Sequence, residues 1–416
     1  MVNEYADPAH LQTPLGHGRR SPLDPVHRAQ DGSALVATAT APASAVAMID
    51  YLSLERWIVM QIDRAAVELW PGQAVTFNER VPSVTSYVRK VSVGDRVLFA
   101  KYDLLGTSLV SLLHGRRGGW AEVVSAQREY LLHPDALHFR EAAQLERLSA
   151  VPVSACPVAG CRYGVLFVGD CSSGVSLGEA ILREPYRTQE FLNRAWQPLR
   201  PLHQARADGW PLIPERSIMG TFRRKFMGRE WQIRLAAVCG VELTAALCRL
   251  VQLVDAMPLP TKVETLLFGD LKPEHVLFME DRVVYLDPGV HCGSHHADLA
   301  KIVSRTLLSL WAAGCNRGAR ELVMRGMTGF VFEQLALRGG KPQLGPMLAL
   351  IGMDIANILS TYLAAPSELP TTDSVKSVRV DAGRILGAFG RMMHTLVAGQ
   401  RPFAAWDVLR LGVRLP

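Results

Sequence analysis

The sequence lacks two features that are common in secreted proteins. One is a cysteine framework: only seven cysteines are scattered over 416 residues, and an odd, sparse set suits a reducing compartment better than disulfide bonds. The other is a signal peptide, because the N-terminal segment has no apolar run behind a basic start. From these absences we expect a cytoplasmic protein with reduced cysteines.

Long hydrophobic runs and a strong charge of one sign are also lacking. The most apolar stretch, residues 344–365, contains Gly, Pro and Asp354, and its apolar residues favour one helical face. It is therefore typical of a buried core helix rather than a membrane span. A formal net charge of +6 is mild for this length and does not by itself indicate nucleic acid as a partner. Residues 1–47 lack periodicity, and we expect a disordered tail there.

Beyond the tail, the chain has enough apolar material for a large core, since hydrophobic residues make up 49% of it. Helical spacing at 51–69 precedes two strand patterns joined by the turn Gly94–Asp95. Later patterns predict helices at 121–132, 138–149, 242–257 and 296–311, and strands at 151–158, 163–170, 263–268 and 283–286. The sequence thus predicts a small β-rich lobe, 48–172, followed by a larger helical lobe, 173–416.

Three charged residues occupy positions that phosphoryl transfer requires. This chemistry needs a cation on the nucleotide phosphates, carboxylates for Mg²⁺, and a carboxylate that orients or deprotonates the attacking hydroxyl. Lys101 lies in the apolar strand VLFAKY, Asp270 follows the strand VETLLF, and Asp287 closes the strand VVYL. A loop, a strand, a turn and a second strand separate the two Asp residues, so we expect both carboxylates at one hairpin edge, facing one cleft.

In this order the motifs resemble the protein-kinase-like superfamily, in particular its aminoglycoside phosphotransferase and choline kinase branch. GDLKPEHVLF (269–278) looks like the catalytic loop, YLDPG (285–289) like the metal-binding turn, and VLFAK (97–101) like the phosphate-binding lysine strand. The resemblance covers residues 75–315. It implies an α+β, two-lobed fold, with a small antiparallel sheet and one main helix in the N-lobe and a larger, mostly helical C-lobe.

The resemblance also implies roles for matching residues in the N-lobe. Lys101 would contact the α- and β-phosphates of ATP and pair with Glu141, for which Glu146 on the same helix is the alternative. The segment 163–177 would be the hinge that holds the adenine by backbone hydrogen bonds. Hydroxyl groups in the nucleotide loop would donate to phosphates, although this loop has no Gly and is a weak match to a Gly-rich loop: Ser83, Thr85 and Ser86.

In the C-lobe, Asp270 would be the catalytic base or hydroxyl-orienting group. Lys272 would steady the γ-phosphate, and Asp287 would bind Mg²⁺. His275 stands where the family has a metal-binding Asn, and a neutral imidazole favours Mn²⁺ or Zn²⁺ over Mg²⁺. Either the second metal is held differently, or one metal suffices, or the site has lost catalysis. Asp298 would bond back to the catalytic loop.

Two further departures lie beside the catalytic motifs. Phe268 replaces the usual His, so one support of the loop is lost or replaced by packing. Pro288 replaces Phe in the metal-binding turn, which the small-molecule branch tolerates.

Two other stretches carry competing interpretations. The basic and aromatic run at 221–234 is either a solvated face or a dock for an acidic or peptide substrate, and an RNA role has no support elsewhere. Its candidate substrate-binding residues are Arg223, Arg224, Lys225 and Arg229. The run at 290–298 invites a zinc interpretation, but no complete second ligand pair follows: His291, Cys292, His295 and His296.

The sequence therefore predicts an ATP- and Mg²⁺-dependent phosphotransferase, with Mn²⁺ as the alternative metal. The expected acceptor is a hydroxyl of a small molecule, although the region from about residue 320 is rich in Arg rather than acidic, which disfavours a cationic antibiotic. One alternative is a kinase that phosphorylates Ser or Thr of a precursor peptide, as in lanthipeptide-type biosynthesis. Another is a nucleotide-binding pseudokinase or scaffold.

Overall fold

The computed structural model describes residues 49–226, 248, 250–252, 265–294, 296–337, 344–398 and 401–414. The tail expected at 1–47 lies outside these residues, and so does most of the helix expected at 242–257. All the described residues belong to one compact unit, residues 46–416.

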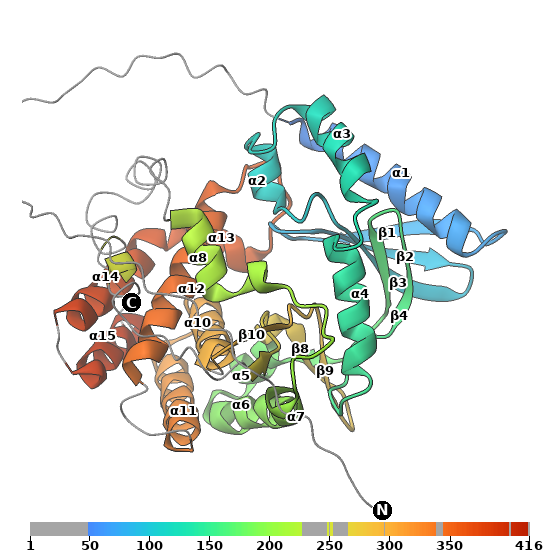
Figure 1. Ribbon diagram of the computed structural model, residues 1–416. Coiled ribbons are helices and arrows are strands. Elements are labelled where there is room, and N and C mark those ends of the chain that lie inside the picture. Colours follow the sequence, from blue (N-terminus) through green and yellow to red (C-terminus); the bar gives the residue numbers. More distant parts are fainter. Residues whose placement is uncertain are drawn as a thin grey trace, which may run out of the picture. The chain divides into compact units, whose positions relative to one another are not determined.

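The N-lobe is built on one antiparallel sheet with the strand order β1-β2-β3-β5-β4 (Figure 1). Its strands are β1 (Val75–Val81), β2 (Tyr87–Val93), β3 (Arg96–Tyr102), β4 (Val158–Arg162) and β5 (Val165–Gly169). Its helices are α1 (Tyr51–Leu69), α2 (Leu109–Leu113), α3 (Trp120–Tyr130) and α4 (Leu137–Leu148). Gly94 has a φ of +58° in the turn between β2 and β3, where the sequence predicts it.

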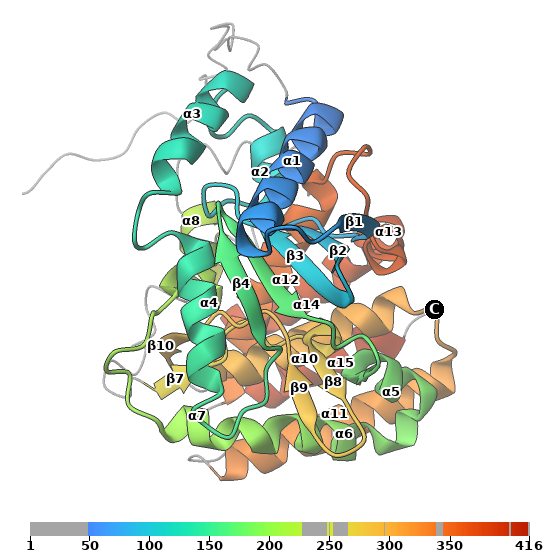
Figure 2. The same ribbon diagram turned by 90° about the vertical axis from the view of Figure 1, so that its right-hand side faces the viewer.

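Alternation along the strands sends neighbouring residues to opposite faces of this sheet. Ala100 and Phe167 pair in register and join the apolar cluster that α1 covers. Lys101 and Leu166 pair next to them, and Leu166 packs against α4. The side chain of Lys101 therefore leaves the sheet on the α4 side. Figure 2 shows α4 lying beside β4 of this sheet.

The C-lobe begins after β5, where residues 170–174 lead into β6, so the expected lobe boundary at 172 lies within this connection. Its short strands are β6 (Val175–Ser176), β7 (Thr265–Leu267), β8 (Val276–Phe278), β9 (Val283–Tyr285) and β10 (His291–Gly293). They form a three-stranded sheet, β6-β8-β9, and a two-stranded sheet, β10-β7.

Helices make up the rest of the described C-lobe. They are α5 (Leu177–Arg183), α6 (Thr188–Trp196), α7 (Arg200–Gln204), α8 (Ile218–Phe226), α10 (His296–Ala312), α11 (Arg317–Ala336), α12 (Leu344–Ala364), α13 (Asp373–Val380), α14 (Ala382–Val397) and α15 (Pro402–Arg414). Two 3₁₀ turns, η3 (Pro214–Arg216) and η4 (Pro273–His275), carry residues of the site. This is the α+β, two-lobed arrangement that the sequence predicts, with a small antiparallel sheet in the N-lobe and a larger, mostly helical C-lobe.

Among the described helices, α12 alone is long and apolar enough to cross a membrane. Of its most apolar 18-residue stretch, 72% is buried inside the protein. It packs against α8 and α10 (Figure 1). The prediction of a buried core helix at 344–365 is confirmed. Just beyond α12, Ala365 and Leu369 join the N-lobe cluster, so the lobes also meet away from the 170–174 connection.

Two predictions about the 151–171 region are wrong. No strand covers 151–158, since β4 begins only at Val158; Pro152 and Pro157 have no N–H to donate to a ladder. The cysteines are not all free either, because Cys156 and Cys171 pair as a disulfide, a pairing that the sequence does not indicate.

Candidate active site

Lys101 and Glu141 form the ion pair that links the sheet to α4. The Nζ atom of Lys101 donates to Oε1 of Glu141 at 2.8 Å, and the Glu141 side chain is only 2% exposed. Glu146, the alternative partner on the same helix, is exposed to solvent. Glu141 shares its helix face with Leu145 and Leu148, both buried, so the core-facing side of α4 carries the carboxylate to Lys101.

α4 is tied to the C-lobe by polar contacts. Gln144 donates to the carbonyl oxygens of Pro211 (2.6 Å) and Val290 (2.9 Å) and accepts from the Val290 N–H at 2.9 Å. One turn earlier, Arg140 pairs with Glu215 of η3. These contacts fix the position from which Glu141 meets Lys101.

The catalytic loop is held from behind by Asp298 at the start of α10. Its two carboxylate oxygens accept the backbone N–H groups of Phe268 (2.7 Å) and Gly269 (2.8 Å), and Nε2 of His203 lies 3.1 Å away. Phe268, in place of the expected His, is fully buried and packs on Tyr285 with ring centroids 5.4 Å apart. At that position the missing support is thus replaced by aromatic packing.

Gly269 is required by the path of this loop. Its φ of +82° lies in the left-handed region, which L side chains rarely adopt. A Cβ atom there would collide with the carbonyl oxygen of Gly289 and with the ring of His291. The close approach brings the loop and the metal-binding turn together, and the Gly289 N–H donates to the Phe268 carbonyl at 3.0 Å.

Cations surround Asp270. Nζ of Lys272 lies 2.8 Å from Oδ2, and Nζ of Lys301 lies 3.5 Å from Oδ1. Burial alone would raise the pKa of Asp270, but Lys272 and Lys301 outweigh it and hold the pKa well below the usual range. Asp270 is therefore an ionised hydrogen-bond acceptor and a weak base.

Lys301 itself rests on a buried ionic network between α10 and α12. Its Nζ lies 3.5 Å from Oδ1 of Asp354. The other oxygen of Asp354 accepts from Arg305 Nε at 2.8 Å and from Ser304 at 2.6 Å. Since a buried charge needs a partner, this chain of contacts fixes the ammonium behind Asp270.

Asp287 has a left-handed backbone, with a φ of +52°, which is rare for a residue with a side chain. Its Oδ1 accepts from Lys101, and Nη1 of Arg216 lies 3.3 Å from the same oxygen. Burial opposes ionisation, yet Lys101 and Arg216 lower the pKa of Asp287. The three residues of the expected convergence, Lys101, Asp270 and Asp287, do lie at one place.

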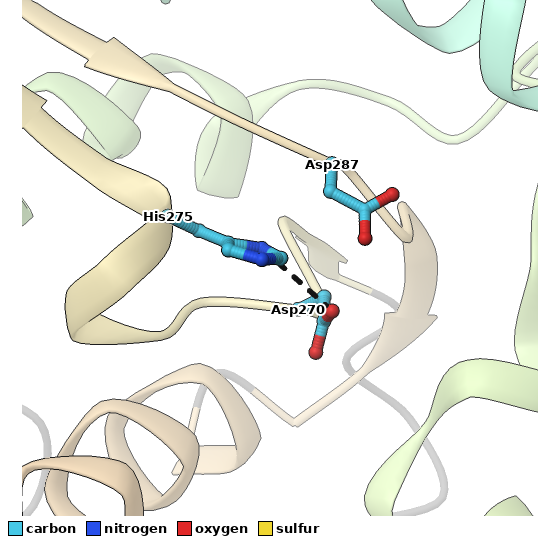
Figure 3. Close-up of side chains that lie close together, drawn as sticks. All are labelled: Asp270, His275 and Asp287. Atoms are coloured by element: carbon cyan, nitrogen blue, oxygen red, sulfur yellow. Dashed lines mark ion pairs between the residues drawn. The ribbon is translucent and has the colours of Figure 1, made fainter. Parts of the chain in front are cut away.

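The same place can hold a divalent metal ion. One ligand atom each of Asp270, His275 and Asp287 lies within 4.8 Å of the other two (Figure 3). Nδ1 of His275 is buried without a hydrogen-bond partner among the described residues, and burial together with Lys272 lowers the pKa of His275, favouring the neutral, ligating imidazole. Two carboxylates suit Mg²⁺ or Mn²⁺, and the imidazole shifts the preference toward Mn²⁺.

The hydroxyl groups of the β1–β2 loop are engaged locally. Oγ of Ser83 accepts the N–H groups of Thr85 and Ser86, both at 3.3 Å. The carbonyl of Thr85 accepts from the N–H of Leu109 at 3.0 Å, which docks the loop on α2. Within the described part of the chain, no hydrogen bond or ion pair joins these three residues to Lys101 or to the carboxylates.

The basic run on α8 divides in two. Arg223 and Arg224 are exposed, as a docking surface requires. Lys225 instead turns toward α12 and donates to the Asn357 carbonyl (2.6 Å) and the Thr361 hydroxyl (2.5 Å). Arg229 lies outside the described residues.

The histidine-rich stretch after Asp287 is engaged in local contacts. Nδ1 of His291 lies 2.8 Å from the Gly289 carbonyl, and Nδ1 of His296 lies 2.8 Å from the Ser294 hydroxyl. Of the zinc candidates, His295 lies outside the described residues. Asp270, His275 and Asp287 are the one metal-competent group in the described ranges.

Sequence reasoning missed two cations of the site, Arg216 and Lys301. Arg216 comes from η3, in a segment with neither strand nor helix periodicity. Lys301 directly follows the motif that contains Asp298 (DLAK), and its place next to that motif was the one available signal. Both residues reach the site through tertiary packing.

No protein-family model matches the sequence, and no curated protein matches it either. Solved structures with a similar backbone include the aminoglycoside phosphotransferase APH(4)-Ia (13% identity, 80% of this chain and 98% of that chain, TM-score 0.46). A choline/ethanolamine kinase family protein from Mesorhizobium loti is 14% identical (85% of this chain, 100% of that chain, TM-score 0.46). The amicoumacin kinase hAmiN, in complex with AMP-PNP, Ca²⁺ and Ami, is 12% identical (85% and 97%, TM-score 0.47). Similarity at this level does not bear on activity, so the functional argument rests on the geometry of the site.

Proposed function

We propose that the protein is an ATP-dependent phosphotransferase that moves the γ-phosphate of ATP to a hydroxyl group of a small molecule. One observation carries the proposal: Lys101, Asp270 and Asp287, far apart in sequence, meet where the N-lobe sheet faces the catalytic loop. A phosphate-binding cation, a hydroxyl-orienting carboxylate and a metal-binding carboxylate are the groups this reaction needs.

In the proposed reaction the lysines bind phosphate groups, and the carboxylates and His275 bind the metal ion. Lys101, held by Glu141, binds the α- and β-phosphates, and Lys272 beside Asp270 steadies the γ-phosphate. Asp287 and His275, in one group with Asp270, would hold a divalent ion, which supplies positive charge to the β- and γ-phosphates when bound. Most of the rate then comes from positioning and charge neutralisation.

Asp270 orients the acceptor. Its carboxylate accepts a hydrogen bond from the acceptor hydroxyl and aims the oxygen at the γ-phosphorus. The new bond joins this oxygen to the phosphorus, the bond from the phosphorus to the β–γ bridging oxygen breaks, and the proton passes to Asp270 and on to solvent. Because the pKa of Asp270 is held so low, its part is orientation more than proton abstraction.

The test is incubation of the protein with γ-labelled ATP, Mg²⁺ or Mn²⁺, and a panel of hydroxyl metabolites and Ser- or Thr-containing peptides. Label on a small molecule is expected, and D270N and D287N should abolish it. Label on a peptide alone would reassign the acceptor. Nucleotide binding without label in any arm, under either metal, would overturn the proposal in favour of a binding protein.

A further inference from the structure

Arg216 stands inside the site without a place in the mechanism above. It comes from η3 and meets both carboxylates that Lys101 meets: Nη2 contacts Oε1 of Glu141, and Nη1 lies 3.3 Å from Oδ1 of Asp287. A third contact, from Nη1 to the Pro288 carbonyl at 3.2 Å, holds the guanidinium against the metal-binding turn. Only 19% of its side chain is exposed.

Two cations therefore share two carboxylates. Glu141 alone is enough to hold Lys101. The positive charge of Arg216 is therefore not needed for the Lys101–Glu141 ion pair. Glu141 can keep both cations in place from the α4 side. Asp287, however, is a hard oxygen ligand, and a divalent ion on it competes with Lys101 and Arg216 for the same oxygen.

Once Asp287 is taken by a divalent ion, both cations need another anion close by. For Lys101 that anion is the α- and β-phosphates. Arg216 keeps its Nη2 on Glu141, and its Nη1 is left facing the metal-binding turn, next to the position of the transferring phosphate. A guanidinium fixed in advance by a buried carboxylate needs little reorganisation to bind a phosphate oxygen.

Within the described ranges there is one group of residues that could hold a metal ion. Its His275 stands where the sequence resemblance leads one to expect the Asn that binds a second Mg²⁺. We propose that Arg216 is a catalytic residue that binds the transferring phosphoryl group and supplies the charge that a second metal ion otherwise supplies. This inference rests on the proposed function. It changes no bond in the reaction: Arg216 donates hydrogen bonds to phosphate oxygens while the acceptor oxygen replaces the bridging oxygen at phosphorus.

The rival explanation is that Arg216 only clamps α4 to η3. The structure offers a matched control, because Arg140 and Glu215 are the neighbours of Glu141 and Arg216 and form a second ion pair across the same contact. R140A loosens the clamp and leaves the guanidinium of Arg216 in place. A purely structural role therefore predicts the same defect in R216A and R140A.

The experiment compares full-length wild type, R216A, R216K and R140A. Affinities for ATP and AMP are measured by calorimetry with Mg²⁺ present and the acceptor absent, and kcat with γ-labelled ATP and the acceptor found above. R216A is expected to lower kcat about 10²–10³-fold and to weaken ATP binding about 10-fold or more while leaving AMP binding unchanged. Guanidinium chloride at millimolar concentration should restore part of the kcat of R216A.

R140A should keep the wild-type ratio of ATP to AMP affinity and show no guanidinium rescue. If R216A does not fold, R216K, which keeps the charge but cannot bridge two partners, should show reduced kcat with partly retained preference for ATP. A wild-type ATP-to-AMP ratio in both Arg216 variants, or the same loss in R140A, overturns the inference. If wild type transfers no phosphate, the proposed function fails, and the ATP and AMP affinities measured with Mg²⁺ then decide whether Arg216 binds phosphate.

Discussion

The two loops that frame the site differ in what holds them. Asp298 accepts two backbone N–H groups of the catalytic loop, and Phe268 fills the space beneath it. The β1–β2 loop is held differently: the apolar side chain of Val84 joins the N-lobe cluster, Ser83 accepts two N–H groups of its own loop, and Thr85 is exposed. One loop is positioned by a buried carboxylate and the core of the C-lobe, and the other by one apolar side chain, a hydroxyl and backbone contacts with α2.

This difference matches what the proposed phosphate transfer requires. In that reaction Asp270 and Asp287 would act on the transferring group, where small displacements are costly, and both are fixed by buried charges and a close backbone approach. The β1–β2 loop would act on parts of the nucleotide that do not react. We therefore expect substitutions in the catalytic loop and its supports to have large effects, and those in the β1–β2 loop to have small ones.

The largest effect is expected for the carboxylates themselves. D270N and D287N should each lower the rate of phosphate transfer about 10³-fold or more, because the first removes the anion that orients the hydroxyl and the second removes a metal ligand. Single-turnover assays with γ-labelled ATP measure the loss. D281N, at an exposed Asp in the turn before β9, is the matched control and should stay near wild type; equal losses in all three would point to misfolding.

G269A tests the backbone of the catalytic loop. The added Cβ meets the Gly289 carbonyl and the His291 ring at a φ of +82°, so we expect a loss of about 3 kcal/mol in the free energy of unfolding. G383A, in α14, where nothing lies within 4 Å of a Cβ, should instead stabilise by about 0.5–1 kcal/mol. Urea unfolding distinguishes the two, and a G269A protein as stable as wild type would contradict the described loop path.

D298A tests the support behind the loop. Two buried N–H groups and His203 would lose their acceptor, so we expect a loss of about 2–4 kcal/mol and slower transfer. Burial raises the pKa of Asp298, but its hydrogen bonds with His203 and Gly269 lower it overall. Asp298 therefore contributes stability above the unfolded Asp pKa of about 3.9, and this contribution is lost as the pH falls through the lower folded value.

The difference in unfolding free energy between wild type and D298A should then be constant at neutral pH and shrink below about pH 4. Thermal unfolding across this range measures it. D63A, at an exposed residue of α1, should match wild type at every pH. A gap that widens toward acid would mean that Asp298 is protonated in the folded protein.

The sequence could predict the meeting of Lys101, Asp270 and Asp287 because each follows or lies in a short apolar strand, and local strand and turn patterns fix where such residues emerge. It could not predict that Arg216 lies in the site, because the packing of the C-lobe, and not a local pattern, places η3 beside Glu141. β1 was also missed as a separate strand, since its pairing with β2 shifts register between Phe77 and Arg80 and interrupts the alternation. Residues placed by local patterns were predictable, and those placed by long-range packing were not.

The smallest effect is expected for the triple variant S83A/T85A/S86A, which sharpens the comparison between the two loops. Because the buried Val84 side chain and the backbone bonds from the N–H groups of Leu109 and Val110 to the loop carbonyls hold the loop, its path should survive removal of the three hydroxyls. We expect KM for ATP to rise by no more than about 5-fold for each hydroxyl that contacts a phosphate, since a neutral hydrogen bond contributes about 1 kcal/mol at most sites, with kcat within about twofold. Steady-state kinetics with varied ATP measures both parameters, and S53A, which loses a hydroxyl near the start of α1, controls for Ser removal elsewhere. A large fall in kcat would show that the β1–β2 loop reaches the transferring phosphate and is as closely coupled to the chemistry as the catalytic loop.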